Sequence, residues 1–153
     1  HPSYGSGPGA IPNDISVILL AADANLGNNL IATIPMASTG QNFAGQQGII
    51  SGWGYTQTGG STVVPDNLQY VQINVFSNAE CSNYWGNSIS DGHICVGNIN
   101  NAGACNGDSG GPLAVNGVLA GVTSWGIEGC FPTHPSVYSS IAYFRNWING
   151  IIN

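Results

Sequence analysis

The sequence is poor in charge. Only 5% of its 153 residues are Asp, Glu, Lys or Arg, Arg145 is the sole Lys or Arg, and the net charge is −6. A chain with one cation has no basic surface, so we expect neither nucleic acid nor anionic lipid as a partner. It also lacks any stretch near 18 apolar residues. Because 42% of the residues are apolar and fall in short runs, we expect a soluble globule rather than a membrane protein.

Other features are missing too. None of the four cysteines belongs to a Cys-x-x-Cys pair, which argues against a zinc site, and we expect no metal and no cofactor. The even cysteine count is typical of an oxidising compartment, so we expect a secreted, extracellular protein. No Asn-x-Ser/Thr sequon occurs, so N-glycosylation is not expected. The chain begins at His1 without a targeting segment, which we interpret as a sign of processing.

The stretch least like ordinary structural sequence is 103–113, Gly-Ala-Cys-Asn-Gly-Asp-Ser-Gly-Gly-Pro-Leu. The hydroxyl of Ser109 could act as a nucleophile if a base lay beside it. The glycines at 107, 110 and 111 would let a substrate carbonyl approach the backbone, and the amides of Gly107 and Ser109 would form an oxyanion hole. A glycine-rich turn between two strands is the structural alternative.

The letters Gly-x-Ser-x-Gly also fit the nucleophile elbow of α/β-hydrolases, in which a helix begins at the serine. Here Pro112 follows, and then two apolar runs separated by Asn116-Gly117, which predicts a β-hairpin. We therefore reject the elbow.

The longer string Gly107-Asp108-Ser109-Gly110-Gly111-Pro112, with Cys105 before it and Ser124-Trp125-Gly126 after it, resembles the nucleophile region of chymotrypsin-like serine proteases of the trypsin superfamily. The resemblance implies an all-β fold with two six-stranded antiparallel barrels. This chain would give the end of the first barrel with the catalytic aspartate (1–22), an inter-barrel crossing segment (23–47), the second barrel (48–140) and a C-terminal helix (141–153). The stretches 103–109 and 135–138 look particularly like the annelid fibrinolytic proteases called lumbrokinases, which implies fibrin and other proteins as substrates.

The local patterns predict the elements. We expect a buried strand over 14–20 and further strands over 47–54, 68–75, 93–94, 118–125 and 136–139. Ser77 and Glu80 have the spacing of a capping box, which predicts a short helix carrying Cys81 and Tyr84. The last segment places Ile141, Phe144, Ile148 and Ile151 on one helical face, with Tyr143 and Trp147 beside it.

The resemblance also implies site residues. Asp14 would be the catalytic aspartate, although an aspartate before an apolar strand also suits a cap or a turn. Ser124 would hydrogen-bond near it, and Ser124-Trp125-Gly126 would pair with the substrate backbone. The pocket for the residue before the cut would have Gly103 as its floor, Gly126 as an open wall, Ser136 narrowing its base and Asn106 at its entrance. Such an uncharged pocket favours apolar or mid-sized side chains, while Glu128 on the rim could reach a basic one; a solvated loop carboxylate is its other interpretation.

The disulfides implied by the resemblance are Cys81–Cys95 and Cys105–Cys130. A third bridge usual in relatives is missing, because Gly48 and Val115 stand at its ends. In relatives, the carboxylate at Asp108 pairs with the α-ammonium of the newly cut N-terminus, and His1 aligns too far away to supply that group.

The catalytic histidine has no candidate, because His1, His93 and His134 all lack the family's setting, and we assign none of them as the base. We hypothesise a two-chain enzyme in which an N-terminal light chain or segment supplies the histidine, the ammonium and most of the first barrel; a truncated chain is the alternative. The expected activity is that of a serine endopeptidase acting on proteins or peptides through an acyl-enzyme. The rival is a catalytically inactive homologue that acts as a binding protein.

Overall fold

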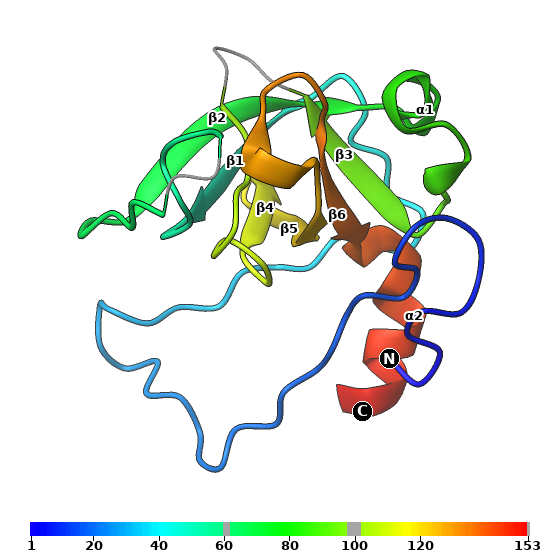
Figure 1. Ribbon diagram of the computed structural model, residues 1–153. Helices are drawn as coiled ribbons and strands as arrows, with labels where there is room; N and C mark the ends of the chain where they lie inside the picture. The colour runs from blue at the N-terminus through cyan, green and yellow to red at the C-terminus, as the bar shows by residue number, and fades with distance from the viewer. Residues whose placement is uncertain (60–61, 98–101, 153) are drawn as a thin grey trace.

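The computed structural model describes residues 1–59, 62–97 and 102–152, and its centre is a closed barrel of six antiparallel strands (Figure 1). Around the barrel the strands follow the order β1, β2, β3, β6, β5, β4, and β4 pairs back with β1. Closure leaves no free edge within this sheet. The strands are β1 (Gln47–Gly52), β2 (Gln69–Phe76), β3 (His93–Gly97), β4 (Pro112–Val115), β5 (Val118–Trp125) and β6 (Ser136–Ser140).

The barrel interior is filled by alternating apolar side chains. Leu113 and Val115 from β4 and Ile73 from β2 are fully buried there, and Val75 from β2 is 2% exposed. Between β4 and β5 the turn residues Asn116 and Gly117 have φ of 50° and 76°, the two positive values that a two-residue hairpin turn needs. The predicted hairpin and the predicted strands of this barrel are confirmed.

Two helices flank the barrel. The first is α1 (Asn78–Trp85), and its capping box is formed as predicted, with Ser77 and Glu80 bonding each other's backbone. The second is α2 (Ile141–Ile152), which buries Ile141, Phe144 and Ile148 and leaves Ile151 half exposed. Residue 153, which the prediction included, lies outside the described residues. Within the described ranges, no helix has both the length and the apolar character that crossing a bilayer would require.

The prediction of a buried strand over 14–20 is wrong. This stretch pairs with none of the described strands, and its side chains at Ile18, Leu19 and Leu20 are 79%, 95% and 61% exposed. The apolar run has strand composition, but a strand forms only where a neighbour satisfies its backbone groups. Figure 1 shows the blue and light-blue chain leaving the barrel as a long loop.

The loop returns to the barrel at residues 35–37. Ala37 donates to the carbonyl of Leu119 (3.0 Å), and the Arg145 guanidinium on α2 donates to the carbonyls of Met36 and Ala37 (2.9 and 3.1 Å). Arg145, the sole Lys or Arg of the sequence, therefore holds the end of this loop against α2.

Candidate active site

Ser109 lies in a tight turn at the start of β4. The Gly110 amide donates to the carbonyl of Thr123 on β5 (3.0 Å), and the Thr123 amide donates back to Gly111 (2.9 Å). A further bond from Gly111 to the Asp108 carbonyl (2.8 Å) closes the turn. These bonds leave the Ser109 side chain exposed on a rigid support, as a nucleophile requires.

The turn before Ser109 depends on glycine. Gly107 has φ of 101°, and a Cβ at this position would come 3.1 Å from the Cα of Gly54, so a larger residue would be strained and crowded. Within the described part of the chain, the amides of Gly107 and Ser109 donate to no protein group. Two amides two residues apart in such a turn can bind one oxyanion.

Asp14 is brought to the same end of the barrel. Ser124 donates its hydroxyl to the Asp14 carboxylate (2.6 Å), and Ser139 donates to the Asp14 carbonyl (2.6 Å). Ser124 directly follows Thr123, the residue that holds the Ser109 turn. The contact of Ser124 with the aspartate is thus confirmed, and Asp14 and Ser109 are attached to adjacent residues of β5.

Each histidine has its own packing environment. The His1 ring packs against Trp147 in a tilted orientation with centroids 4.6 Å apart, and the N-terminal ammonium of His1 donates to the Ile15 carbonyl (2.7 Å). His93 is 5% exposed and is bonded to Ser90. The ring of His134 lies 4.7 Å from that of Trp85. None of these contacts is with Ser109 or Asp14.

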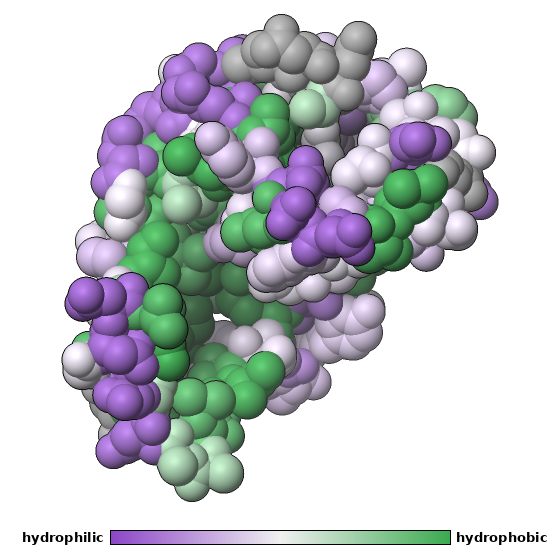
Figure 2. All heavy atoms as spheres, turned by 90° about the vertical axis from the view of Figure 1, so that its left-hand side faces the viewer, coloured by the Kyte–Doolittle hydropathy of each residue, from purple (hydrophilic) through white to green (hydrophobic). Residues whose placement is uncertain are grey.

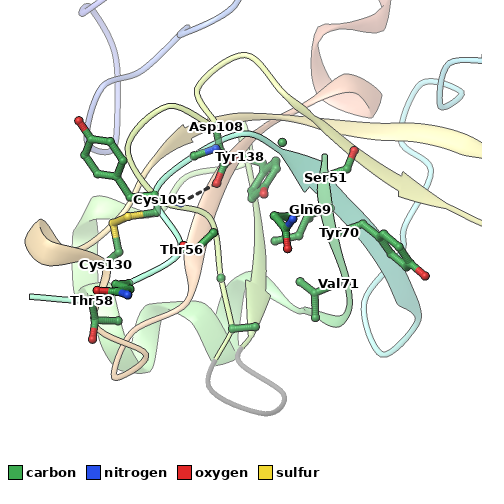
Figure 3. Close-up of a pocket in the computed structure, with 17 residues that line it drawn as sticks. Ser51, Thr56, Thr58, Gln69, Tyr70, Val71, Cys105, Asp108, Cys130 and Tyr138 are labelled. Carbon is green, nitrogen blue, oxygen red and sulfur yellow. Dashed lines mark hydrogen bonds between the residues drawn. A yellow bond between two sulfur atoms is a disulfide. The ribbon is translucent and has the colours of Figure 1, made fainter. Parts of the chain in front are cut away.

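The Asp108 carboxylate lines a cavity of the barrel (Figure 3). It accepts hydrogen bonds from the amides of Gly54 (2.8 Å) and Cys105 (2.9 Å). Gly52 and Gly54 form its seat, since a Cβ on either would overlap the carboxylate. The cavity, of about 270 Å³, also contains Tyr138, whose pKa is raised by burial and by the charge of Asp108, against a hydrogen bond from Thr123.

A second, smaller pocket collects residues predicted to bind substrate. Gly103, Gly126 and Ser136 line it together with Cys130, which is disulfide-bonded to Cys105. The Ser136 hydroxyl accepts a bond from the Ala104 amide (3.0 Å), which fixes it at the base. Among the described residues, none that lines the pocket carries a carboxylate, and Glu128 is exposed and lies outside the lining.

Trp125 and Asn106 lie outside this pocket. Trp125 belongs to an aromatic cluster, with its ring 4.9 Å from Trp85 and 5.8 Å from His93 in edge-to-face orientation. Asn106 is exposed, and its carbonyl accepts a bond from Tyr55 (3.0 Å). The other disulfide, Cys81–Cys95, joins α1 to β3, so both pairings agree with those implied by the resemblance.

Several residues that build the site were not identified from the sequence. Thr123 holds the Ser109 turn, Ser139 holds the Asp14 backbone, and Gly54 supports Asp108. Gly54 is the last residue of the strand expected over 47–54, and that expectation assigned it no role in the site. Thr123 and Ser139 gave no signal, because their roles depend on which loops reach β5 and β6.

A closed six-stranded barrel with a C-terminal helix and a nucleophile turn of this type defines a chymotrypsin-like serine protease fold. The chain belongs to the trypsin family, whose family model, described as Trypsin, matches residues 1–148.

Relatives at this level include a fibrinolytic enzyme, isozyme C, from Lumbricus rubellus, which is 40% identical over 97% of this chain. Kallikrein-8 of Rattus norvegicus is 39% identical over 97% of this chain. The chain spans 65% and 56% of the length of these two proteins. The solved structure of neuropsin, a serine protease expressed in the limbic system of mouse brain, superposes with a TM-score of 0.90 at 35% identity, covering 100% of this chain and 68% of the other. The expected resemblance to annelid fibrinolytic proteases is confirmed.

Proposed function

We propose that this chain is the C-terminal part of a secreted serine endopeptidase. The observation that carries the proposal is the attachment of Asp14 and the Ser109 turn to neighbouring residues of β5, through bonds of 2.6 and 3.0 Å. Residues 1–22 end the first barrel, 23–47 cross between barrels, 48–140 form the second barrel and 141–153 the C-terminal helix. Secretion is supported by the two disulfides.

In the proposed reaction the Ser109 oxygen attacks the carbonyl carbon of the scissile bond. A histidine takes the hydroxyl proton, and Asp14 keeps that imidazole in the right tautomer and stabilises its cation. The amides of Gly107 and Ser109 donate to the oxyanion. The imidazolium then gives its proton to the leaving amine, and water releases the acyl group from Ser109 by the same steps in reverse.

The histidine comes from an N-terminal light chain or segment. This inference is supported by the share of the relatives that the chain spans, 65% and 56%. It is also supported by exposed apolar side chains in residues 1–22 and in the crossing segment, such as Leu19 (95%) and Leu30 (92%), which a missing first barrel would cover. Figure 2 shows a hollow on this side of the molecule with hydrophobic atoms along its walls.

The same N-terminal part would supply an α-ammonium to Asp108. The cavity beside this carboxylate supports the idea, because Ile50 and Val71 line it and could receive the side chain of a terminal residue. His1 is not that terminus, since its ammonium is bonded to the Ile15 carbonyl. An ion pair at Asp108 would then hold the neighbouring oxyanion amides in place.

The expected cleavage is after apolar or mid-sized side chains. Support for an uncharged side chain comes from the lining at Gly103, Gly126 and Ser136, which holds no carboxylate among the described residues. Asn106 at the entrance and the strand Ser124-Trp125-Gly126 would contact the substrate on either side. The fibrinolytic name of the earthworm relative supports fibrin as one protein substrate.

The rival function is binding without catalysis. One structural relative is a mutant of human heparin binding protein, with a TM-score of 0.73 and 27% identity. Heparin is a poor candidate here, because the net charge is −6 and Arg145, the sole Lys or Arg, is bonded to backbone carbonyls.

An organophosphate distinguishes the two functions. In the complete protein we expect stoichiometric phosphorylation of Ser109, located by peptide mass analysis, and none in S109A. A rate no higher than that of free serine would support the binding protein and contradict the protease. Intact-mass analysis of the untreated sample separates the two origins of the missing half, since a single species at the 15.7 kDa of this chain would contradict the two-chain form.

A further inference from the structure

His93 uses both nitrogens of its buried ring to join two parts of the chain. The Ser90 amide donates to Nδ1 (3.1 Å), so Nδ1 is an acceptor and the ring is neutral. The other nitrogen then carries the proton and interacts with the backbone of Ala10, which belongs to the N-terminal segment. Contact is close on that side as well, because a Cβ at Gly9 would come 2.8 Å from Cε1 of the ring.

The segment anchored in this way is strained. Ile11 and Asn13 have φ of 46° and 60°, and positive φ is a rare and costly conformation for a β-branched residue such as Ile11. Such a conformation persists only where its surroundings hold both ends. Ala10 is held at one end by His93 and by the Ser88 carbonyl (2.8 Å).

Asp14 lies at the other end of this strained segment. Its carbonyl accepts the hydroxyl of Ser139 (2.6 Å), and Ser139 is the residue directly opposite His93 in the β3–β6 pair. The two anchors are therefore neighbours across one strand pair. On its other side, the His93 ring meets the edge of Trp125 at 5.8 Å, next to Ser124, which binds the Asp14 carboxylate.

We infer that neutral His93 is a positioning residue for the proposed protease site: it locks the strained turn that presents Asp14 and supports Trp125 of the substrate-binding strand. This inference rests on the proposed function for its effect on catalysis. It does not depend on that function for the anchoring itself.

Protonation of His93 would break the hydrogen bond with Ser90 and weaken this anchoring, because a proton on Nδ1 would face the Ser90 N–H. Burial lowers the pKa of His93, and the bond to Ala10 opposes this shift, so the ring stays neutral near pH 7 and charges in acid. The titratable or charged groups on the elements around it include Asp91 before β3, Tyr138 on β6, Tyr143 and Arg145 on α2, Glu80 and Tyr84 on α1, and Asp14. Within the described residues, none of these side chains is bonded to the His93 ring.

Hydrogen exchange of the complete protein tests the anchoring. We expect the amides of residues 8–15, corrected for intrinsic rates, to exchange about tenfold faster at pH 5 than at pH 8. In H93Q, whose amide can still donate to Ala10 and cannot ionise in this range, this acceleration should be absent. H93L, which loses both bonds, should exchange fast at pH 8 too. H1Q is the matched control, since it removes another histidine of the same segment and should behave as the wild type.

Kinetics test the consequence for catalysis. We expect H93L to lower kcat by about tenfold on all substrates and to raise KM more for an extended peptide than for a single-residue ester, because only the former reaches Trp125. H93Q should restore most of both parameters. G9A, which crowds the ring from the side of Ala10, should reproduce H93L even if H93L fails to fold.

Equal exchange of residues 8–15 at the two pH values in the wild type, or the same acceleration in H93Q, would overturn the inference. So would equal KM effects on both substrates. If the wild-type protein shows no labelling at Ser109, the proposed function fails instead, and the exchange data still decide whether His93 is an anchor.

Discussion

The resemblance implies a third disulfide at the positions that Gly48 and Val115 occupy here, and the structure allows such a bridge to be built. In the β1–β4 pair, Ile49 is opposite Ala114 and Ile50 is opposite Leu113, so the register puts position 48 opposite 115. A Cβ at Gly48 would come 3.0 Å from Cγ2 of Val115 and 2.8 Å from Leu113. The valine side chain therefore fills the space in which a sulfur would lie.

The bridged variant G48C/V115C should be more stable than the wild type. A bond between positions 48 and 115 closes a loop of about 67 residues, which lowers the entropy of the unfolded chain by the equivalent of about 4 kcal/mol. Loss of Val115 packing and crowding against Leu113 offset about 1–2 kcal/mol of this. We expect a net gain of about 2–3 kcal/mol, or a rise in Tm of about 4–12 °C for a chain of this size.

Thermal unfolding followed by circular dichroism measures the effect. The matched control is G48S/V115S, which places similar atoms at both positions without a bond. Thiol titration should find no free thiol in the cysteine variant. If two free thiols remain, or if the oxidised variant melts no higher than the serine control, the two positions are not adjacent as described.

Three further outcomes are expected. S124A removes the 2.6 Å hydrogen bond to the Asp14 carboxylate, and hydrogen bonds to charged groups contribute about 1.5–3 kcal/mol. We therefore expect kcat to fall at least tenfold with little change in KM. The control S16A, at an exposed position, should have no effect. Trypsin should leave the folded chain intact, because Arg145 is half-buried and its guanidinium is bonded to the carbonyls of Met36 and Ala37. After reduction and denaturation of the chain, trypsin should cut once and give the fragments 1–145 and 146–153. Cleavage of the folded chain would contradict the described contacts of Arg145. The pKa of His93 is lowered in the folded state, so the unfolded state binds an additional proton as the pH falls below about 6.5. Below that pH the free energy of unfolding of the wild type should fall by up to about 1.4 kcal/mol per pH unit more than that of H93Q, and above it the two slopes should be equal. Parallel curves of unfolding free energy against pH would contradict this.

The barrel was largely predictable because its sequence signals are local. Alternation gave the strands, Asn116-Gly117 gave the hairpin, and Ser77 with Glu80 gave the start of α1. These patterns depend on residues close in sequence and on one buried face. The disulfide pairs were inferred from the resemblance, because four cysteines alone allow three pairings.

The N-terminal third was predicted less well for a physical reason. The run from Ser16 to Leu20 has the composition of a buried strand, yet it pairs with none of the described strands and most of its apolar side chains are exposed. Ser139 and Thr123 were missed since their hydroxyl and backbone bonds join segments more than 10 residues apart in sequence. The role of His93 was hidden in the same way, because the sequence places it 83 positions from Ala10.

The most direct test of the proposed site is the distance from the Ser109 hydroxyl to the nearest imidazole nitrogen in a crystal structure of the complete protein. We expect a histidine from the N-terminal part at hydrogen-bond distance, about 2.6–3.2 Å, with its other nitrogen donating to the Asp14 carboxylate. A complete structure in which no imidazole lies between Asp14 and Ser109 would contradict the assignment of these two residues as a catalytic pair.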